Sequence, residues 1–461
     1  MDAERRATPM GRLAVQRVVE RYPLEPGLWV TLTPDADTWR ATIESDPAPV
    51  DLPAVRSPAE PNYGADALAH LLRYDRIPSV PRFSLVRHAP TPEASGERPV
   101  DDDGQVVVVG ERVVVSWARA VRDVPYTAPV TLAQLAAVDF LGVPVTHGLL
   151  IWTTPSGHEA PVAVITKYLP RATDGRHSLI TMLGKGLDAE PAETPSLSSR
   201  MGRIAGALHV ALATRSSVLA DPVRTATTGE LTDWHERIRG TLDRAALIAA
   251  DAADNGSGPG RAFLARLGRL EADADALLEV ADDGLPVLVQ RVHGDLHTGR
   301  ILRWAGGLMI TGFGDEPERD TIGVGRQPAA RDLARLLHSL GEVARQVDGD
   351  RFTDRAGGDP AEGEDGQGSA TGTWLPAARQ RLLGAYRAEL TVARRQDLLD
   401  ERLLAGFEAE HAAREVIENA RREAEAASAA EAVQAVQAAQ AVPAHEASRT
   451  TVWEQSTDRR W

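Results

Sequence analysis

Residues 290–304 read Gln-Arg-Val-His-Gly-Asp-Leu-His-Thr-Gly-Arg-Ile-Leu-Arg-Trp, and this stretch decides the fold. A short apolar run before it, Val287–Val289, is expected to form a strand that delivers His293, Gly294 and Asp295 to a turn. Glycine at this point lets the backbone bend tightly beside an exposed carboxylate. A carboxylate held there can accept the proton of an attacking hydroxyl group.

A second apolar run follows at Leu308–Ile310 and ends at the polar turn Thr-Gly-Phe-Gly-Asp-Glu-Pro, residues 311–317. Two strand ends of this kind, lying side by side, form the catalytic face of a kinase-type lobe. We therefore expect the surrounding sequence to form strands and helices that support such a face.

The N-terminal part of the chain has mainly strand patterns. Residues 1–100 are expected to be irregular, apart from a helix over Met10–Tyr22. Gln105–Val109 and Arg112–Trp117 are β-branched runs around Gly110-Glu111, which predicts a tight hairpin. A helix at Thr131–Phe140 and strands at Leu149–Thr153 and Val162–Tyr168 complete this part.

After Pro170 the pattern changes from strands to helices. Residues 348–372 are acidic and rich in glycine, which predicts a flexible insertion loop. The predicted helices are Leu197–Ala213, Glu230–Ala249, Arg261–Val280, Arg331–Gln346, Leu375–Thr391 and Leu398–Ala441. The end of the last one is rich in Ala and Glu; it is either a surface helix or a coiled coil that binds a protein partner.

The composition excludes several classes of protein. The chain has 461 residues, a formal charge of −15 and no cysteine, so disulfides and thiolate metal sites are excluded. The acidic balance argues against nucleic-acid binding, and no apolar run is long enough for a membrane helix. Because the N-terminus lacks a secretory signal, cytoplasmic localisation is expected. Only two lysines occur, Lys167 and Lys185.

Taken together, the motifs resemble those of the bacterial maltokinases and actinobacterial glucosamine kinases. The resemblance runs from about residue 105 to about 420 and rests on Val113-Val-Val-Ser-Trp117, Leu169-Pro-Arg-Ala-Thr-Asp-Gly175, Met201-Gly-Arg-Ile-Ala-Gly-Ala-Leu-His209, His293-Gly-Asp-Leu-His297, Glu316-Pro317 and Arg331-Asp-Leu-Ala334. It implies an α+β, two-lobed fold of the aminoglycoside-phosphotransferase and protein-kinase type. The implied parts are an N-terminal cap (1–100), a β-rich N-lobe (101–170), a helical C-lobe (171–442) and a disordered tail (443–461).

The resemblance also implies roles for particular residues. Asp295 matches the catalytic base, and the segment Thr166, Lys167, Tyr168 and Leu169 matches the hinge that holds the adenine of ATP. The family activity it implies is ATP-dependent phosphorylation of a sugar. The implied ligands are therefore a nucleotide and a sugar.

Three residues that this family needs are replaced. The lysine that grips the ATP phosphates falls at Ser116, and Arg112, Arg119 or Arg122 would have to substitute for it. The metal-binding Gln or Asn falls at Arg300, and the metal-binding Asp falls at Gly312. Mg²⁺ binding is therefore doubtful, because a metal needs oxygen ligands.

Two further features bear on the metal and on the sugar acceptor. Asp315 and Glu316 follow Gly312 closely and are substitute metal ligands or solvated turn residues. The family has aromatic residues near the last helix, whereas Glu408–Glu425 contains none. The sugar that the chain would accept is thus undefined.

Several interpretations of this sequence stay open. The first is a pseudokinase that acts in binding or regulation, and the alternative is an active kinase with unusual metal geometry. A structural protein that binds neither ligand is a third. His293, Asp295 and His297 could also start an iron site of two histidines and one carboxylate, with any further ligand coming from elsewhere, such as His338. His209 and His338 are otherwise expected to be structural histidines on helix faces.

Overall fold

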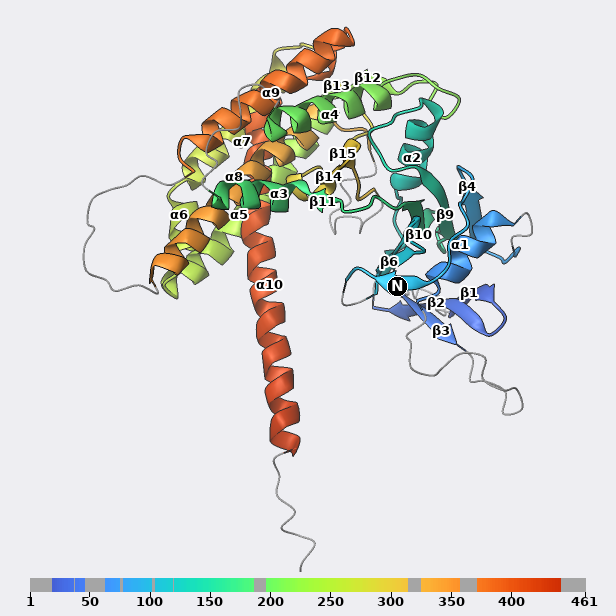
Figure 1. Ribbon diagram of the computed structural model, residues 1–461. Coiled ribbons are helices and arrows are strands. Elements are labelled where there is room, and N and C mark those ends of the chain that lie inside the picture. Colours follow the sequence, from blue (N-terminus) through green and yellow to red (C-terminus); the bar gives the residue numbers. More distant parts are fainter. Residues whose placement is uncertain are drawn as a thin grey trace, which may run out of the picture.

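The computed structural model describes residues 19–36, 38–45, 63–74, 78–101, 104–118, 120–185, 196–313, 325–356 and 371–440, with backbone only for 350–356 and 428–440. Its described N-terminal part holds two sheets, and its C-terminal part consists mainly of helices (Figure 1). Each part has its own buried cluster, which includes Tyr22, Trp39 and Trp152 in the first and Trp234 and Phe407 in the second.

A four-stranded sheet lies at the start of the described chain. Its order is β1-β2-β3-β8, formed by β1 (Glu20–Glu25), β2 (Leu28–Asp35), β3 (Thr38–Ser45) and β8 (Ala120–Arg122). The prediction of an irregular segment is therefore wrong here, and Glu20–Tyr22 belongs to a strand rather than to a helix. Buried Tyr22 and Leu24 alternate with more exposed neighbours, which is the period of a half-buried strand.

A six-stranded sheet forms the next layer, in the order β4-β9-β10-β7-β6-β5. Its strands are β4 (Phe83–Arg87), β5 (Glu97–Pro99), β6 (Val106–Val109), β7 (Val113–Trp117), β9 (Thr146–Thr153) and β10 (Glu159–Lys167). The predicted β6–β7 hairpin is confirmed, and Val109 pairs with Val113. Gly110 and Glu111 both have positive φ, 55° and 52°, as a tight turn requires.

Two helices accompany these sheets. Helix α1 (Ala65–Arg73) buries Leu68 and Leu72 in the N-terminal cluster. Helix α2 spans Ala128–Ala137, so the helix predicted at Thr131–Phe140 exists but begins and ends three residues earlier. Thr127 and Ala128 at its start line the main cleft of the molecule.

Most helices of the C-terminal part were predicted with different boundaries, but α3 was not predicted. The helix predicted at Arg261–Val280 is two helices that meet at Ala265–Arg266, and the predicted insertion at 348–372 begins as helix, because α8 continues to Ala356. Residues 357–370 of that insertion lie outside the described residues. The helices are α3 (Gly175–Gly184), α4 (Leu197–Leu212), α5 (Thr228–Asp254), α6 (Gly258–Leu264), α7 (Leu267–Asp282), α8 (Ala329–Ala356), α9 (Trp374–Val392) and α10 (Leu404–Gln440).

Short strands and turns connect these helices near the cleft. One sheet has the order β11-β14-β15, and another pairs β12 with β13. They consist of β11 (Thr173–Asp174), β12 (Val223–Thr225), β13 (Leu288–Gln290), β14 (Ile301–Trp304) and β15 (Gly307–Ile310), with 3-10 turns η1 (Thr298–Arg300), η2 (Gln396–Leu398) and η3 (Glu401–Leu403). The two apolar runs predicted to flank the site are thus β13 and β15.

The last helix, α10, continues well past the helical body (Figure 1). Its side chains from Arg421 to Ala427 are all exposed, as a surface helix requires. The proposed tail at 443–461 lies outside the described residues. Within the described part of the chain, none of the helices combines the length and the apolar character needed to cross a membrane.

Candidate functional site

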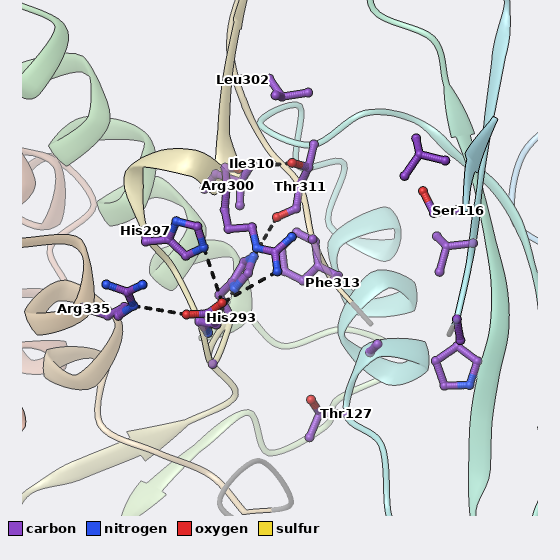
Figure 2. A pocket seen from close by; sticks show the side chains of 18 of the residues that line it. Ser116, Thr127, His293, His297, Arg300, Leu302, Ile310, Thr311, Phe313 and Arg335 are labelled. Atoms are coloured by element: carbon purple, nitrogen blue, oxygen red, sulfur yellow. Dashed lines mark hydrogen bonds and ion pairs between the residues drawn. The ribbon is translucent and has the colours of Figure 1, made fainter. Parts of the chain in front are cut away.

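The predicted site residues line one cleft of about 1810 Å³, to which both parts of the chain contribute. Ser116 and the predicted hinge segment Thr166–Leu169 come from the six-stranded sheet and the residues after it. Asp295 follows β13, Arg300 ends η1 and Gly312 follows β15. Ser116 lies across the cleft from Arg300 (Figure 2). The structure therefore brings together residues that are almost 200 positions apart in sequence.

Asp332 on α8 fixes the loop that carries Asp295. The Asp332 carboxylate accepts hydrogen bonds from the backbone N–H groups of His293, at 2.7 Å, and of Gly294, at 2.9 Å. Gly294 has a φ of 96°, a conformation that glycine adopts without strain. Asp332 belongs to the Arg331-Asp-Leu-Ala334 motif, so that motif positions the predicted base.

A buried hydrogen-bond chain holds Asp332 in turn. His209 Nε2 lies 3.1 Å from Asp332 Oδ2, and His209 Nδ1 lies 2.6 Å from the Tyr386 hydroxyl. Burial raises the pKa of Asp332, but the hydrogen bond and charge of His209 outweigh it, so the pKa stays below its usual value. The prediction of His209 as a packed structural histidine is confirmed, because its side chain is fully buried.

Asp295 faces three basic side chains. The distances are 3.2 Å to Arg335 Nε, 3.5 Å to His297 Nε2 and 3.7 Å to Arg300 Nη2. Figure 2 shows His297 and Arg300, which belong to the turn η1 and the residue before it, and Arg335 from α8 reaching the same point. Burial raises the pKa of Asp295, but His297 and then Arg335 and Arg300 outweigh burial and hold the pKa well below its usual range.

Arg335 is a site residue that the sequence reasoning missed. It lies one helical turn after Arg331 on α8, and it also donates to Glu342 at 2.8 Å. The available signal was its spacing: a residue three positions after Asp332 lies near the same face of the helix as Asp332.

The side chain of Arg300 covers Gly312. A Cβ atom at position 312 would lie 2.6 Å from Arg300 Cδ and 2.9 Å from Arg300 Nε, which is too close for real atoms. The pairing of β14 with β15 sets this neighbourhood, because the Thr311 N–H donates to the Arg300 carbonyl at 2.8 Å. Arg300 therefore fills the space into which a side chain at 312 would project.

These residues do not fit a magnesium ion. A guanidinium lies where one metal ligand was expected, and Gly312 has no side-chain oxygen to offer. Asp315 and Glu316, the substitute ligands considered from sequence, lie outside the described residues.

The contacts of the histidines do not favour the iron-site hypothesis. His338 Nε2 lies 2.9 Å from Glu415 Oε2 and is part of a different cluster. His293 Nε2 donates to the Thr311 carbonyl at 2.9 Å, and its Nδ1 faces the Asp295 N–H at 3.3 Å. Both ring nitrogens of His293 are thus engaged with the protein.

Backbone hydrogen bonds fix the segment Thr166–Leu169, which the resemblance predicts to be the hinge. The backbone N–H of Tyr168 donates to the Arg112 carbonyl at 2.9 Å, and that of Lys167 donates to the Val145 carbonyl at 2.8 Å. Of the arginines considered as substitutes for the missing lysine, Arg122 lines the cleft and Arg112 does not, while Arg119 lies outside the described residues.

The opposite side of the cleft is formed by the helical part. From α10 it receives His411, Arg414, Glu415, Ile417, Glu418, Asn419, Arg421 and Arg422. Aromatic walls are common in sugar sites, and this segment supplies none. Positively charged side chains take their place.

Comparison with known proteins points to one kind of enzyme. The chain is 31% identical over 345 residues to a glucosamine kinase of Mycolicibacterium smegmatis, which covers 74% of this chain and 78% of the relative. It is 30% identical over 345 residues to a glucosamine kinase of Streptacidiphilus jiangxiensis, covering 70% and 72%. No family model matches the chain.

Solved structures agree with these relatives. A glucosamine kinase in complex with glucosamine, ADP and inorganic phosphate has a TM-score of 0.66 and 26% identity, over 87% of this chain and 90% of that one. A second crystal structure of a glucosamine kinase, form A, gives a TM-score of 0.66 and 25% identity, over 87% and 88%.

Proposed function

Since the chain belongs to the glucosamine kinase family, we propose that it is a two-lobed, kinase-like protein that binds a nucleotide but has lost most or all phosphotransfer. Its role is then binding or regulation rather than catalysis. The observation that carries the proposal is the position of Arg300 over Gly312, where the family pattern expects two metal ligands.

The cations that would neutralise bound phosphates differ here from those of an active kinase. Phosphoryl transfer relies on Mg²⁺ and a lysine to neutralise the phosphate oxygens and align them. Here Ser116 replaces that lysine, and Arg300 supplies a fixed cation in place of a bound metal. A guanidinium can pair with a phosphate, but it carries one positive charge and cannot coordinate the phosphate oxygens as a divalent metal does.

The low pKa of Asp295 also opposes catalysis. A carboxylate accepts a proton poorly when its pKa lies far below the working pH. Arg335, His297 and Arg300 all stabilise the charged form of Asp295 and so lower its pKa. Asp295 is present in the cleft, but these three partners oppose its use as a base.

Nucleotide binding is retained in this proposal because the hinge Thr166–Leu169 lines the cleft. A structural neighbour was solved with ADP, which supports a nucleotide as ligand here. Binding without metal then needs cations from the protein, and Arg122 and Arg300 both face the cleft.

An active sugar kinase is the second candidate. It is favoured by the 31% identity to a glucosamine kinase and by the retained Asp295. It would require metal ligands from outside the replaced positions, and Asp315 and Glu316 are the residues to test.

Isothermal titration calorimetry with ATP, with Mg²⁺ and with a chelator, tests the proposal. We expect the same affinity under both conditions, because the cations come from the protein. Binding that disappears in chelator would contradict the proposal and favour the active kinase. Asp315→Asn with Glu316→Gln is the variant that would then abolish the metal dependence.

A further inference from the structure

Two arginines face each other at one edge of the cleft. The backbones of Gln290 and Gln327 exchange hydrogen bonds of 3.0 and 2.7 Å in an antiparallel bridge. Antiparallel register places the next residues, Arg291 and Arg326, opposite each other on one side of that bridge. Like charges at such positions destabilise the pairing unless something compensates them.

The described residues provide no carboxylate partner for either arginine. Arg326 donates to the backbone carbonyl of Asp221, and the carboxylate of Asp221 pairs with Arg215 instead. Arg291 is half-buried and makes no side-chain hydrogen bond or ion pair with the described residues. Burial and then the charge of Arg326 lower the pKa of Arg291.

This pair adjoins the cleft. Arg291 lines it; the side chain of Arg326 is not part of the lining, but its chain neighbours Gly325 and Gln327 are. Arg291 also lies two residues before His293, at the start of the loop that carries Asp295. A ligand held by Arg291 would therefore lie in the same cleft as the predicted base.

Positively charged side chains predominate along the whole cleft. Among the described residues that line it are thirteen arginines and one lysine, against four carboxylates, in a chain whose formal charge is −15. Residues 314–324 hold four carboxylates and one arginine in sequence, so counting all of them at the cleft still leaves a large excess of cations. A cleft lined by one sign of charge concentrates ligands of the opposite sign.

We propose that the cleft binds a phosphorylated small molecule, such as a sugar phosphate, whose phosphate group is clamped by Arg291 and Arg326. The inference rests on the proposed function, which makes this cleft a ligand site. A guanidinium presents a planar fork that matches phosphate oxygens. A phosphate carries nearly two negative charges at neutral pH and so neutralises both arginines, whereas a carboxylate carries one. Glucosamine, which the structural neighbour binds together with ADP and inorganic phosphate, carries an amine and suits this pair poorly.

Calorimetric titration of the full chain at low salt tests the inference. The ligands are glucose 6-phosphate, inorganic phosphate, glucose and glucosamine. We expect glucose 6-phosphate and inorganic phosphate to bind, and glucose and glucosamine not to bind. Arg291→Gln and Arg326→Gln are expected to weaken glucose 6-phosphate binding at least about tenfold, whereas Arg291→Lys, which keeps the charge, loses less.

A matched control is Arg269→Gln, which removes an 85% exposed arginine on α7 outside the cleft lining and should leave the affinity unchanged. Misfolding of the variants is checked by thermal unfolding. Arg291→Gln relieves a like-charge contact, so its melting temperature should equal or exceed that of the wild type. Glucose or glucosamine binding as tightly as glucose 6-phosphate would overturn the inference. So would an unchanged affinity in Arg291→Gln and Arg326→Gln.

Uncharged adenosine separates this inference from the proposed function. Adenosine reports on the hinge alone, because it has no phosphate. Adenosine binding without glucose 6-phosphate binding contradicts the phosphate clamp and leaves the nucleotide proposal standing. The reverse result contradicts nucleotide binding and supports the clamp.

Discussion

The guanidinium arm of Arg300 occupies the space directly above Gly312, with its Cδ 2.6 Å from where a Cβ at 312 would lie. The two replacements fit each other sterically: a long side chain at 300 needs the small residue at 312. The contact predicts that position 312 cannot take a side chain unless Arg300 is shortened or moves, whereas Arg300 can be shortened on its own.

Gly312→Asp alone is expected to destabilise the fold. The new Cβ would meet Arg300, and position 312 has a φ of 89°, which costs a non-glycine residue about 1–3 kcal/mol. Chemical denaturation measures the loss. Gly312→Asp with Arg300→Gln should recover the steric part of it, so additive effects in this double-mutant cycle would contradict the coupling.

Asp332→Ala is expected to cost about 3–5 kcal/mol of unfolding free energy, because a buried partner of His209 and two backbone N–H groups is lost. Urea unfolding provides the measurement. Asp275→Ala serves as control: Asp275 is 56% exposed and pairs with His235, and its loss should cost under about 1 kcal/mol. Equal losses of unfolding free energy in both variants would contradict the role of Asp332 in fixing the Asp295 loop.

The contribution of Glu415 to the unfolding free energy should change with pH in the acidic range. Burial raises its pKa, but His338 and Arg345 outweigh burial and lower the pKa to about 2 from 4.5. Since the folded pKa is depressed, the stabilisation is fully present above pH 4.5 and is lost as the pH falls toward 2. The difference in unfolding free energy between wild type and Glu415→Gln should therefore shrink over that range. A difference that is constant with pH would contradict this assignment.

Arg335→Gln is expected to raise the pKa of Asp295, because the variant removes a positive charge 3.2 Å from Asp295 Oδ1. Carboxyl carbon NMR shifts followed against pH measure the change. Arg345→Gln is the matched control, since Arg345 lines the same cleft but pairs with Glu415. A pKa of Asp295 that does not differ between Arg335→Gln and wild type would show that Arg335 does not hold this carboxylate.

Much of the helical part could be predicted from sequence, because strong amphipathic periods and local signals determine it. Leu197–Ala213 shows this, with Met201 and Leu208 buried at helical spacing. The strands β1 to β3 were missed because their alternation is interrupted by Pro23 and Pro34 and by polar residues such as Thr31, which the other strands bury. Such tertiary burial is not visible in a local pattern.

The site was predictable where short motifs carry it. The His293–His297 stretch pointed to Asp295, and positions 116, 300 and 312, which we infer to be replaced relative to the family, line the same cleft. The spacing of Arg335 from Asp332 pointed to the same helix face, but its contact with Asp295, like the opposition of Arg291 and Arg326, depends on which elements pack together. Their roles arise from contacts between α8, β13 and the turn at Gln327.

Restoring one family residue at a time should not restore catalysis. Ser116→Lys, Arg300→Gln and Gly312→Asp each repair one part of a group that acts on a single transition state, and such groups are strongly non-additive. Coupled ADP release with glucosamine should stay at background for each single variant. The triple variant should gain Mg²⁺-dependent ATP turnover, and a gain from any single change would contradict the account.

The most direct test of the central claim is coupled ADP release by the wild-type protein with ATP, Mg²⁺ and glucosamine, maltose or glucose, compared with Asp295→Asn. We predict that both proteins give the same background rate, because Asp295 is held by Arg335, His297 and Arg300 beside a site without metal ligands at 300 and 312. Robust turnover by the wild type that Asp295→Asn abolishes would contradict the account and establish an active sugar kinase.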